Sequence, residues 1–128
     1  MPKILLVEDE EILREAFSFI LSTLPYEADT AANGKIALEK CKESTYDLIL
    51  LDLMMPVMNG VEFLDTFTKT NQTSTTKIIV MSNLSSSQLL EQALEYNIHR
   101  SVLKSDVSPA HLITLINEEL YVPAMLKT

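Results

Sequence analysis

The stretch Leu48-Ile49-Leu50-Leu51-Asp52, followed at once by Leu53-Met54-Met55-Pro56-Val57-Met58-Asn59-Gly60, decides the fold of this chain. Four apolar residues in a row predict a strand that is buried on both faces, as in the middle of a parallel sheet. The segment that ends in Asn59-Gly60 predicts a turn. Asp52 stands where the strand ends, so we expect its carboxylate at the edge of the sheet where open α/β folds place their sites.

Three other short apolar runs also end in polar residues. They are Ile4-Leu5-Leu6-Val7 before Glu8-Asp9, Lys77-Ile78-Ile79-Val80-Met81 before Ser82, and Ser101-Val102-Leu103 before Lys104. The carboxyl ends of parallel strands all face one edge of the sheet. These polar residues are therefore expected in one pocket with Asp52, provided that the four strands are neighbours.

Short apolar runs alternate with amphipathic segments along the whole chain. The predicted strands are 3–7, 27–31, 47–51, 77–81 and 100–103, and the predicted helices are 10–24, 35–43, 60–69, 86–96 and a last one from Ser108-Pro109 to near Tyr121. This order predicts an α/β protein, a doubly wound (βα)5 fold with a five-stranded parallel sheet between two layers of helices. A polar loop is predicted over 70–76, and residues 1–128 are expected to form a single domain.

Helical periodicity predicts which side chains two of the helices bury. For 10–24 the predicted apolar face comprises Ile12, Leu13, Ala16, Phe17, Ile20 and Leu24. For 86–96 it comprises Leu89, Leu90, Ala93 and Leu94.

The formal net charge is −8, and part of it is concentrated in Glu8-Asp9-Glu10-Glu11. Such acidity disfavours direct contact with nucleic acid and favours cations or basic partners. The single cysteine, Cys41, cannot form an internal disulfide, which favours a reducing compartment. No apolar stretch approaches the roughly 20 residues of a membrane span, so we predict a cytoplasmic protein without membrane contact.

The predicted pocket has the composition of a phosphoryl-transfer site. Its three carboxylates repel one another, so some must hold a proton or share a cation. Mg²⁺ fits, because it commonly binds one or two carboxylates together with water and phosphate oxygens. Asp52 would be the nucleophile, and Lys104 and Ser82 would hold the phosphoryl oxygens.

These residues resemble the receiver domain of two-component response regulators over essentially the whole chain. The matching segments are Ile4 to Glu10, Ala32-Asn33-Gly34, Asp47 to Gly60, Ser82, and Val102-Leu103-Lys104-Ser105. The block around Asp52 is highly specific, and the ordered set is more specific still. The resemblance is to a chemotaxis-regulator-like receiver, stand-alone or excised, and it implies a flavodoxin-like sheet with strand order 2-1-3-4-5.

The resemblance also implies roles for single residues. Asp52 would accept a phosphoryl group from a phosphohistidine on a sensor histidine kinase or phosphotransfer protein, Ser82 would be the switch hydroxyl, and Lys104 would bind the phosphoryl group. The implied Mg²⁺ ligands are Asp9, Asp52, the backbone carbonyl of Met54 and, through water, Glu8. Such a domain catalyses its own phosphorylation and dephosphorylation without being a conventional enzyme.

Three positions depart from the family pattern. Ser101 stands where an aromatic switch residue is usual, Ser105 where proline is usual, and Asn97-Ile98 where a Gly-Ala pair is usual. Asn97 can take the left-handed conformation that glycine takes at the end of a helix. The fourth helix, fifth strand and fifth helix would bind an unknown downstream protein, and without a ring at Ser101 this face either works differently or switches more weakly.

Three other functions compete with this interpretation. A nucleotide- or flavin-binding domain would need a glycine-rich turn after the first strand, where this chain has Glu8-Asp9-Glu10. A hydrolase that forms an aspartyl phosphate would carry a second acid two residues beyond the nucleophile, where this chain has Met54. A receiver-like scaffold that is never phosphorylated stays open, because Ser101 and Ser105 are unusual.

Overall fold

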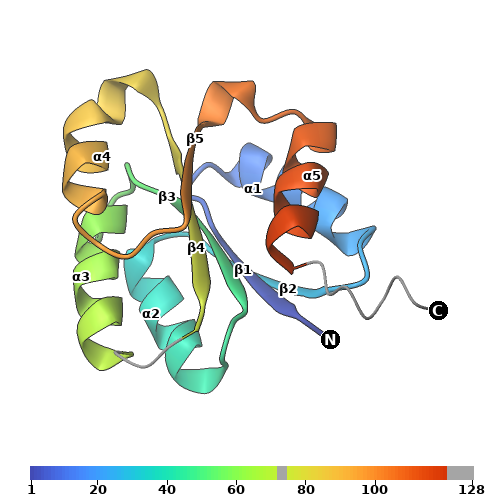
Figure 1. Ribbon diagram of the computed structural model, residues 1–128, viewed down its shortest axis with the longest axis horizontal. Helices are drawn as coiled ribbons and strands as arrows, with labels where there is room; N and C mark the ends of the chain where they lie inside the picture. The colour runs from blue at the N-terminus through green and yellow to red at the C-terminus, as the bar shows by residue number, and fades with distance from the viewer. Residues whose placement is uncertain (72–74, 121–128) are drawn as a thin grey trace.

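The computed structural model describes residues 1–71 and 75–120, in which strands and helices alternate as predicted (Figure 1). The strands are β1 Lys3–Val7, β2 Glu27–Ala31, β3 Leu48–Asp52, β4 Lys77–Ser82 and β5 Arg100–Leu103. The α-helices are α1 Glu11–Ser22, α2 Gly34–Glu43, α3 Gly60–Thr70, α4 Ser87–Ala93 and α5 Pro109–Leu120. Two short 3₁₀ turns, η1 Leu84–Ser86 and η2 Lys104–Asp106, precede α4 and α5.

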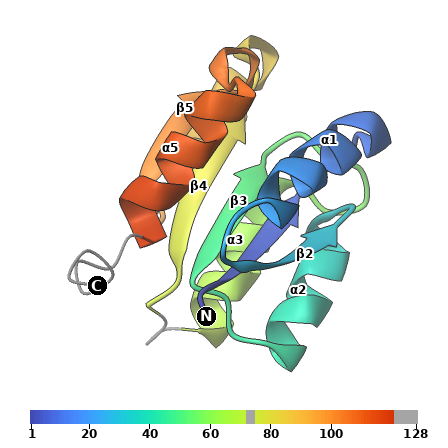
Figure 2. The ribbon, with the colours of Figure 1, turned by 90° about the vertical axis from the view of Figure 1, so that its right-hand side faces the viewer.

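The five strands are parallel and lie in the order β2-β1-β3-β4-β5, which confirms the predicted fold. Helices α1 and α5 cover one face of the sheet, and α2, α3 and α4 cover the other (Figures 1 and 2). The chain passes from β1 to β2 on one side and then to β3 on the other side of β1. The carboxyl ends of β1 and β3 therefore border the point where the strand order reverses, which is where such sheets bind ligands.

Strand β3 is buried on both faces, because its side chains alternate between two apolar layers. Leu48 and Leu50 pack in the layer that contains residues of α1 and α5, whereas Ile49 and Leu51 pack in the layer of α2 and α3. Burial on both faces requires an unbroken apolar run. Asp52, the first polar residue after that run, is held at the end of a strand that is fixed by packing on either side.

Two Asn-Gly pairs begin helices on the α2–α3 side of the sheet. At α2 the side chain of Asn33 accepts a hydrogen bond from the backbone N–H of Ile36 at 2.9 Å. At α3 the N–H of Glu62 donates to Asn59 Oδ1 at 2.9 Å, and the N–H of Asn59 donates to Glu62 Oε1 at 3.0 Å. This reciprocal cap fixes the point at which the loop after β3 enters α3.

The helix predicted over 86–96 is shorter in the structure. It ends at Ala93, and the N–H of Leu94 closes its last turn on the carbonyl of Leu90 at 3.0 Å. Leu94, which was predicted to be buried, is 57% exposed. The prediction for Asn97 is also wrong, because Val57, with φ of 70°, is the one described non-glycine residue that has a positive φ. The helix ends well before Asn97, so no left-handed residue is required there.

The predicted apolar face of α1 is wrong at two positions, since Ile12 is 86% exposed and Ala16 is exposed as well. The fully packed residues are Phe17 and Leu21, with Leu13 beside them. Successive residues lie about 100° apart around a helix. An apolar stripe through positions 13, 17 and 21 therefore leaves 16 outside its margin and 12 on the opposite, solvent side of the helix.

Within the described residues, none of the helices combines the length and the apolar character that a membrane crossing requires. The predicted helix end near Tyr121 and residues 72–74 of the predicted loop lie outside the described residues.

Candidate functional site

The polar residues predicted at the strand ends lie at one edge of the sheet. They are Glu8-Asp9 after β1, Asp52 at the end of β3, Ser82 at the end of β4 and Lys104 directly after β5. The strand register pairs Asp52 with Met81 and Ser82 with Leu103. The ends of three adjacent strands thus carry Asp52, Ser82 and Lys104, at similar positions along the strand direction.

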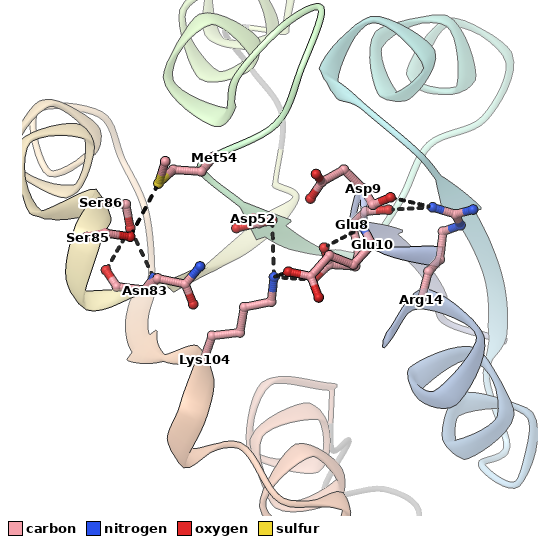
Figure 3. A network of polar contacts seen from close by, with 10 residues as sticks. All are labelled: Glu8, Asp9, Glu10, Arg14, Asp52, Met54, Asn83, Ser85, Ser86 and Lys104. Carbon is pink, nitrogen blue, oxygen red and sulfur yellow. Dashed lines mark hydrogen bonds and ion pairs between the residues drawn. The ribbon is translucent and has the colours of Figure 1, made fainter. Parts of the chain in front are cut away.

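Three carboxylates converge in this pocket, where oxygen atoms of Glu8, Asp9 and Asp52 lie within 4.8 Å of one another. Lys104 Nζ lies 2.6 Å from Glu8 Oε1 and 3.3 Å from Asp52 Oδ2 (Figure 3). Glu8, Asp52 and Lys104 are all buried. A single ammonium group therefore bridges the acids that follow β1 and end β3.

Burial changes the acidity of these groups. Removal from water, together with the charge of Glu8, raises the pKa of Asp52 from 3.8 to about 7. Burial likewise raises the pKa of Glu8, although Lys104 opposes this shift. Burial acts against the charge of Lys104, but the contact with Glu8 and the charge of Asp52 outweigh it and raise the pKa of Lys104. Near neutral pH the Lys104 ammonium is therefore charged, while the Asp52 carboxyl is partly protonated and partly ionised.

The donor set suits a divalent cation. Asp52 Oδ1 is buried and accepts no hydrogen bond from any described residue. Buried acceptors are rarely left without a partner, and a cation at this oxygen would satisfy it. Three carboxylates offer the hard oxygen ligands that Mg²⁺ prefers, and the one charge of Lys104 does not neutralise them all. The residues present therefore fit Mg²⁺, while the parts predicted for the Met54 carbonyl and for a water on Glu8 stay predictions.

The loops after β3 and β4 form the rim beside Asp52 (Figure 3). Met54 is about half exposed, and its Sδ accepts a weak hydrogen bond from Ser85 Oγ at 3.7 Å. The N–H of Asn83 donates to Ser86 Oγ at 3.0 Å, and Ser86 Oγ donates to the carbonyl of Asn83 at 2.7 Å. Ser82 directly precedes this turn, which leads into α4.

Two residues that the sequence did not single out contact the site. Glu10, the first residue of the predicted helix 10–24, has its Oε1 3.7 Å from Lys104 Nζ. Arg14 of α1 donates from Nη1 to the carbonyl oxygens of Glu8 at 2.9 Å and Asp9 at 3.3 Å. The run of acids could have suggested the first contact. The second is made to main-chain atoms, which leave no signal in the residue types.

Gly60 packs directly against the backbone of Asp52. A Cβ at Gly60 would lie 2.6 Å from the carbonyl oxygen of Asp52 and 2.9 Å from Leu53 Cα. These are backbone atoms, which cannot move aside by changing a rotamer. Gly60→Ala must therefore push the loop before α3 away from the end of β3. We expect Gly60→Ala to lower the free energy of unfolding, measured by urea denaturation, by about 1–3 kcal/mol.

Gly34→Ala is the matched control for Gly60→Ala. A Cβ at Gly34 would meet the carbonyl oxygen of Met58 at 2.8 Å, in the loop rather than at Asp52. Both variants should lose stability, but only Gly60→Ala should also weaken Mg²⁺ binding in calorimetry. Equal Mg²⁺ affinities in the two folded variants would show that Gly60 does not support Asp52.

A parallel doubly wound sheet with an acidic pocket and a lysine at its carboxyl edge defines a receiver-type α/β domain. Residues 4–117 match the family model of the response regulator receiver domain. The chain therefore belongs to the response regulator receiver domains of two-component systems, as the sequence predicted.

Curated relatives extend well beyond the matched region. Response regulator ArlR of Staphylococcus saprophyticus is 38% identical over 104 residues, which cover 81% of this chain and 46% of that protein. Transcriptional regulatory protein LnrK of Bacillus subtilis is 37% identical over 107 residues, which cover 81% of this chain and 47% of that protein. The chain spans about half the length of these relatives.

Solved structures share the fold over nearly the whole chain. Chemotaxis protein CheY4 of Vibrio cholerae has a TM-score of 0.82 and 29% identity, and the match covers 94% of this chain and 99% of that one. Response regulator TrrA from Thermotoga maritima, determined in complex with Mg(2+)-BeF, has a TM-score of 0.77 and 32% identity, with 94% and 100% covered.

Proposed function

We propose that this chain is a phosphoryl-accepting signalling domain, in which Asp52 takes a phosphoryl group from a phosphohistidine of a sensor histidine kinase or phosphotransfer protein in a Mg²⁺-dependent reaction. The observation that carries the proposal is the environment of Asp52. Its Oδ2 lies 3.3 Å from Lys104 Nζ, and its buried Oδ1 has no hydrogen-bond donor among the described residues. The family match and the neighbour in complex with Mg(2+)-BeF support the same reaction.

In the proposed reaction a carboxylate oxygen of Asp52 attacks phosphorus. The bond from phosphorus to the histidine nitrogen breaks, and the leaving imidazole keeps the electron pair and takes up a proton. Mg²⁺, when bound, would neutralise charge on the phosphoryl oxygens. Lys104 is charged and already lies beside Asp52, so it would hold one of these oxygens, and Ser82 would donate its hydroxyl to another. Attack of water on phosphorus would later break the bond from phosphorus to the Asp52 oxygen, release inorganic phosphate and restore the carboxylate.

The proposed output is a change in a protein-binding face formed by α4, β5 and α5. Phosphorylation adds about −1.5 to −2 charge next to Lys104. The new phosphoryl oxygens would draw the hydroxyl of Ser82, and with it the turn before α4, toward the pocket. Ser101 is exposed on this face, so the change would have to spread without a ring. Residues 1–128 would act as a single receiver module. A cytoplasmic location stays a prediction. The absence of direct nucleic-acid contact also stays a prediction, since two relatives are named transcriptional regulatory proteins.

Labelling with a small phosphoryl donor tests the proposal. Incubation with acetyl phosphate and Mg²⁺ should add one phosphoryl group by intact mass spectrometry, because the pocket supplies the nucleophile and its cations. The label should be absent with EDTA and in Asp52→Asn. Asp47→Asn, at the opposite end of β3, should label like the wild type.

The other outcomes of this labelling separate the competing functions. Absence of any label, with acetyl phosphate and with a phosphorylated histidine donor, would support the unphosphorylated scaffold. Continuous release of phosphate from simple phosphoesters would support the hydrolase. A label that persists in Asp52→Asn would place the acceptor elsewhere.

A further inference from the structure

We infer that Arg14 is a positioning residue of the proposed Mg²⁺ site, because its guanidinium holds the backbone of Glu8 and Asp9 so that their carboxylates face Asp52. The inference rests on the proposed function. Arg14 lies in the first part of α1 and donates from Nη1 to the carbonyl oxygen of Glu8 at 2.9 Å and to that of Asp9 at 3.3 Å. The guanidinium lies on the side of the Glu8–Asp9 segment that faces away from Lys104 and Asp52 (Figure 3).

The Glu8–Asp9 segment is held by hydrogen bonds to its backbone and to the Glu8 carboxylate. The N–H of Glu8 donates to the carbonyl of Ala31 in β2 at 3.0 Å, and the N–H of Glu10 donates to Glu8 Oε2 at 3.1 Å. Arg14 provides the contacts to the two carbonyl oxygens. Holding these two carbonyls limits how far the backbone of Glu8 and Asp9 can rotate, and this backbone carries the two carboxylates that lie within 4.8 Å of Asp52. Outer contacts of this kind set the affinity of metal sites through the ligands that they orient.

The charge of Arg14 and its contacts act on Mg²⁺ in opposite directions. A positive charge close to the acids repels a divalent cation, so its removal should strengthen binding if charge alone matters. Loss of the two carbonyl contacts should instead weaken binding, because the carboxylates would no longer be held together. The sign of the change therefore separates positioning from simple electrostatics.

Mg²⁺ titration by calorimetry at pH 8 provides the test. We expect Arg14→Met to weaken Mg²⁺ binding about tenfold. Arg14→Lys keeps the charge and a donor nitrogen, so it should restore binding to within about threefold of the wild type. At saturating Mg²⁺ the labelling rate of Arg14→Met with acetyl phosphate should return to near that of the wild type, since Asp52 and Lys104 are unchanged. Lys35→Met removes an exposed charge on α2 and should not weaken binding.

Each outcome bears on one claim. Equal or tighter Mg²⁺ binding by Arg14→Met, with a wild type that binds, would overturn the role of Arg14 and leave the proposed function intact. A wild type that binds no Mg²⁺ would overturn the proposed metal site itself. If circular dichroism shows Arg14→Met to be unfolded, Arg14→Gln carries the same comparison, and unweakened binding there overturns the inference.

Discussion

Asp52→Asn is expected to raise the free energy of unfolding by about 2–4 kcal/mol at pH 8 without Mg²⁺. The folded protein raises the pKa of Asp52 from 3.8 to about 7, chiefly by burial and by the charge of Glu8. A carboxyl whose pKa is raised on folding binds its proton more tightly in the folded state. The folded state therefore loses stability as the pH rises from about 4 to about 7. Asparagine imitates the protonated carboxyl and removes this loss.

Urea denaturation in EDTA at pH 5 and pH 8 measures the effect of Asp52→Asn, and the gain should be smaller at pH 5. Millimolar Mg²⁺ should narrow the difference, because it binds the folded wild type more tightly than the variant. Asp29→Asn is the control of opposite sign, since the hydrogen bond from Tyr46 lowers the pKa of Asp29. A gain in Asp52→Asn that grew on acidification would contradict the assignment of a raised pKa.

The sheet could be predicted from the sequence because burial on both faces leaves one choice of residue type. A polar side chain inside Leu48–Leu51 would have to enter an apolar layer, so the run itself marks the strand. The predicted bounds of β1, β2 and β5 also match the structure, but only β1 owes this to a buried apolar run, since β2 and β5 are partly exposed. Strand-end residues are then placed by topology, which is why Glu8 and Asp52, 44 positions apart, could be predicted to meet.

The helix was predicted from residue 86 and α4 begins at Ser87, but the 3₁₀ turn before it and its early end at Ala93 could not be predicted in this way. The segment Asn83 to Ser87 contains polar side chains that bond to nearby backbone groups, which competes with helical hydrogen bonding. The Ser86 hydroxyl forms hydrogen bonds with the backbone N–H and carbonyl of Asn83, and a 3₁₀ turn forms before the helix. At the other end, Tyr96 OH donates to Asp65 Oδ1 of α3 at 3.0 Å. Such a contact, from the segment after α4 to α3, is invisible to helical periodicity, which assigned Leu94 to the core.

Within the site, residue types were predictable but the pairing was not. The family resemblance implied that Glu8 acts as a ligand through water, and the structure adds the direct 2.6 Å contact of Glu8 with Lys104. Which acid a buried ammonium approaches depends on side-chain length and on packing at the strand ends. Arg14 was missed because its acceptors are carbonyl oxygens, which every residue carries.

Lys104→Met is expected to lower the free energy of unfolding by about 3–5 kcal/mol at pH 8 without Mg²⁺. Lys104 is the ammonium that contacts both Glu8 and Asp52, which are 0% and 2% exposed. Methionine has a similar length but leaves these carboxylates buried beside each other without a positive charge. Urea denaturation gives the change, and lower pH should reduce it because the acids can then take up protons.

A matched lysine on the same sheet separates this effect from the loss of any surface charge. Lys77 pairs with Glu119 at 3.7 Å and its side chain is 41% exposed, so Lys77→Met should change the free energy of unfolding by less than about 1 kcal/mol.

Adding Glu8→Gln to Lys104→Met removes one of the buried, unpaired carboxylates and should recover part of the lost stability. Mg²⁺ should also stabilise Lys104→Met, because it relieves the repulsion between the carboxylates. Labelling of Asp52 by acetyl phosphate should nevertheless stay at least about a hundredfold slower than in the wild type. Mg²⁺ does not replace the ammonium group that holds the phosphoryl oxygen. Recovery of the labelling rate with Mg²⁺ alone would limit Lys104 to a structural role.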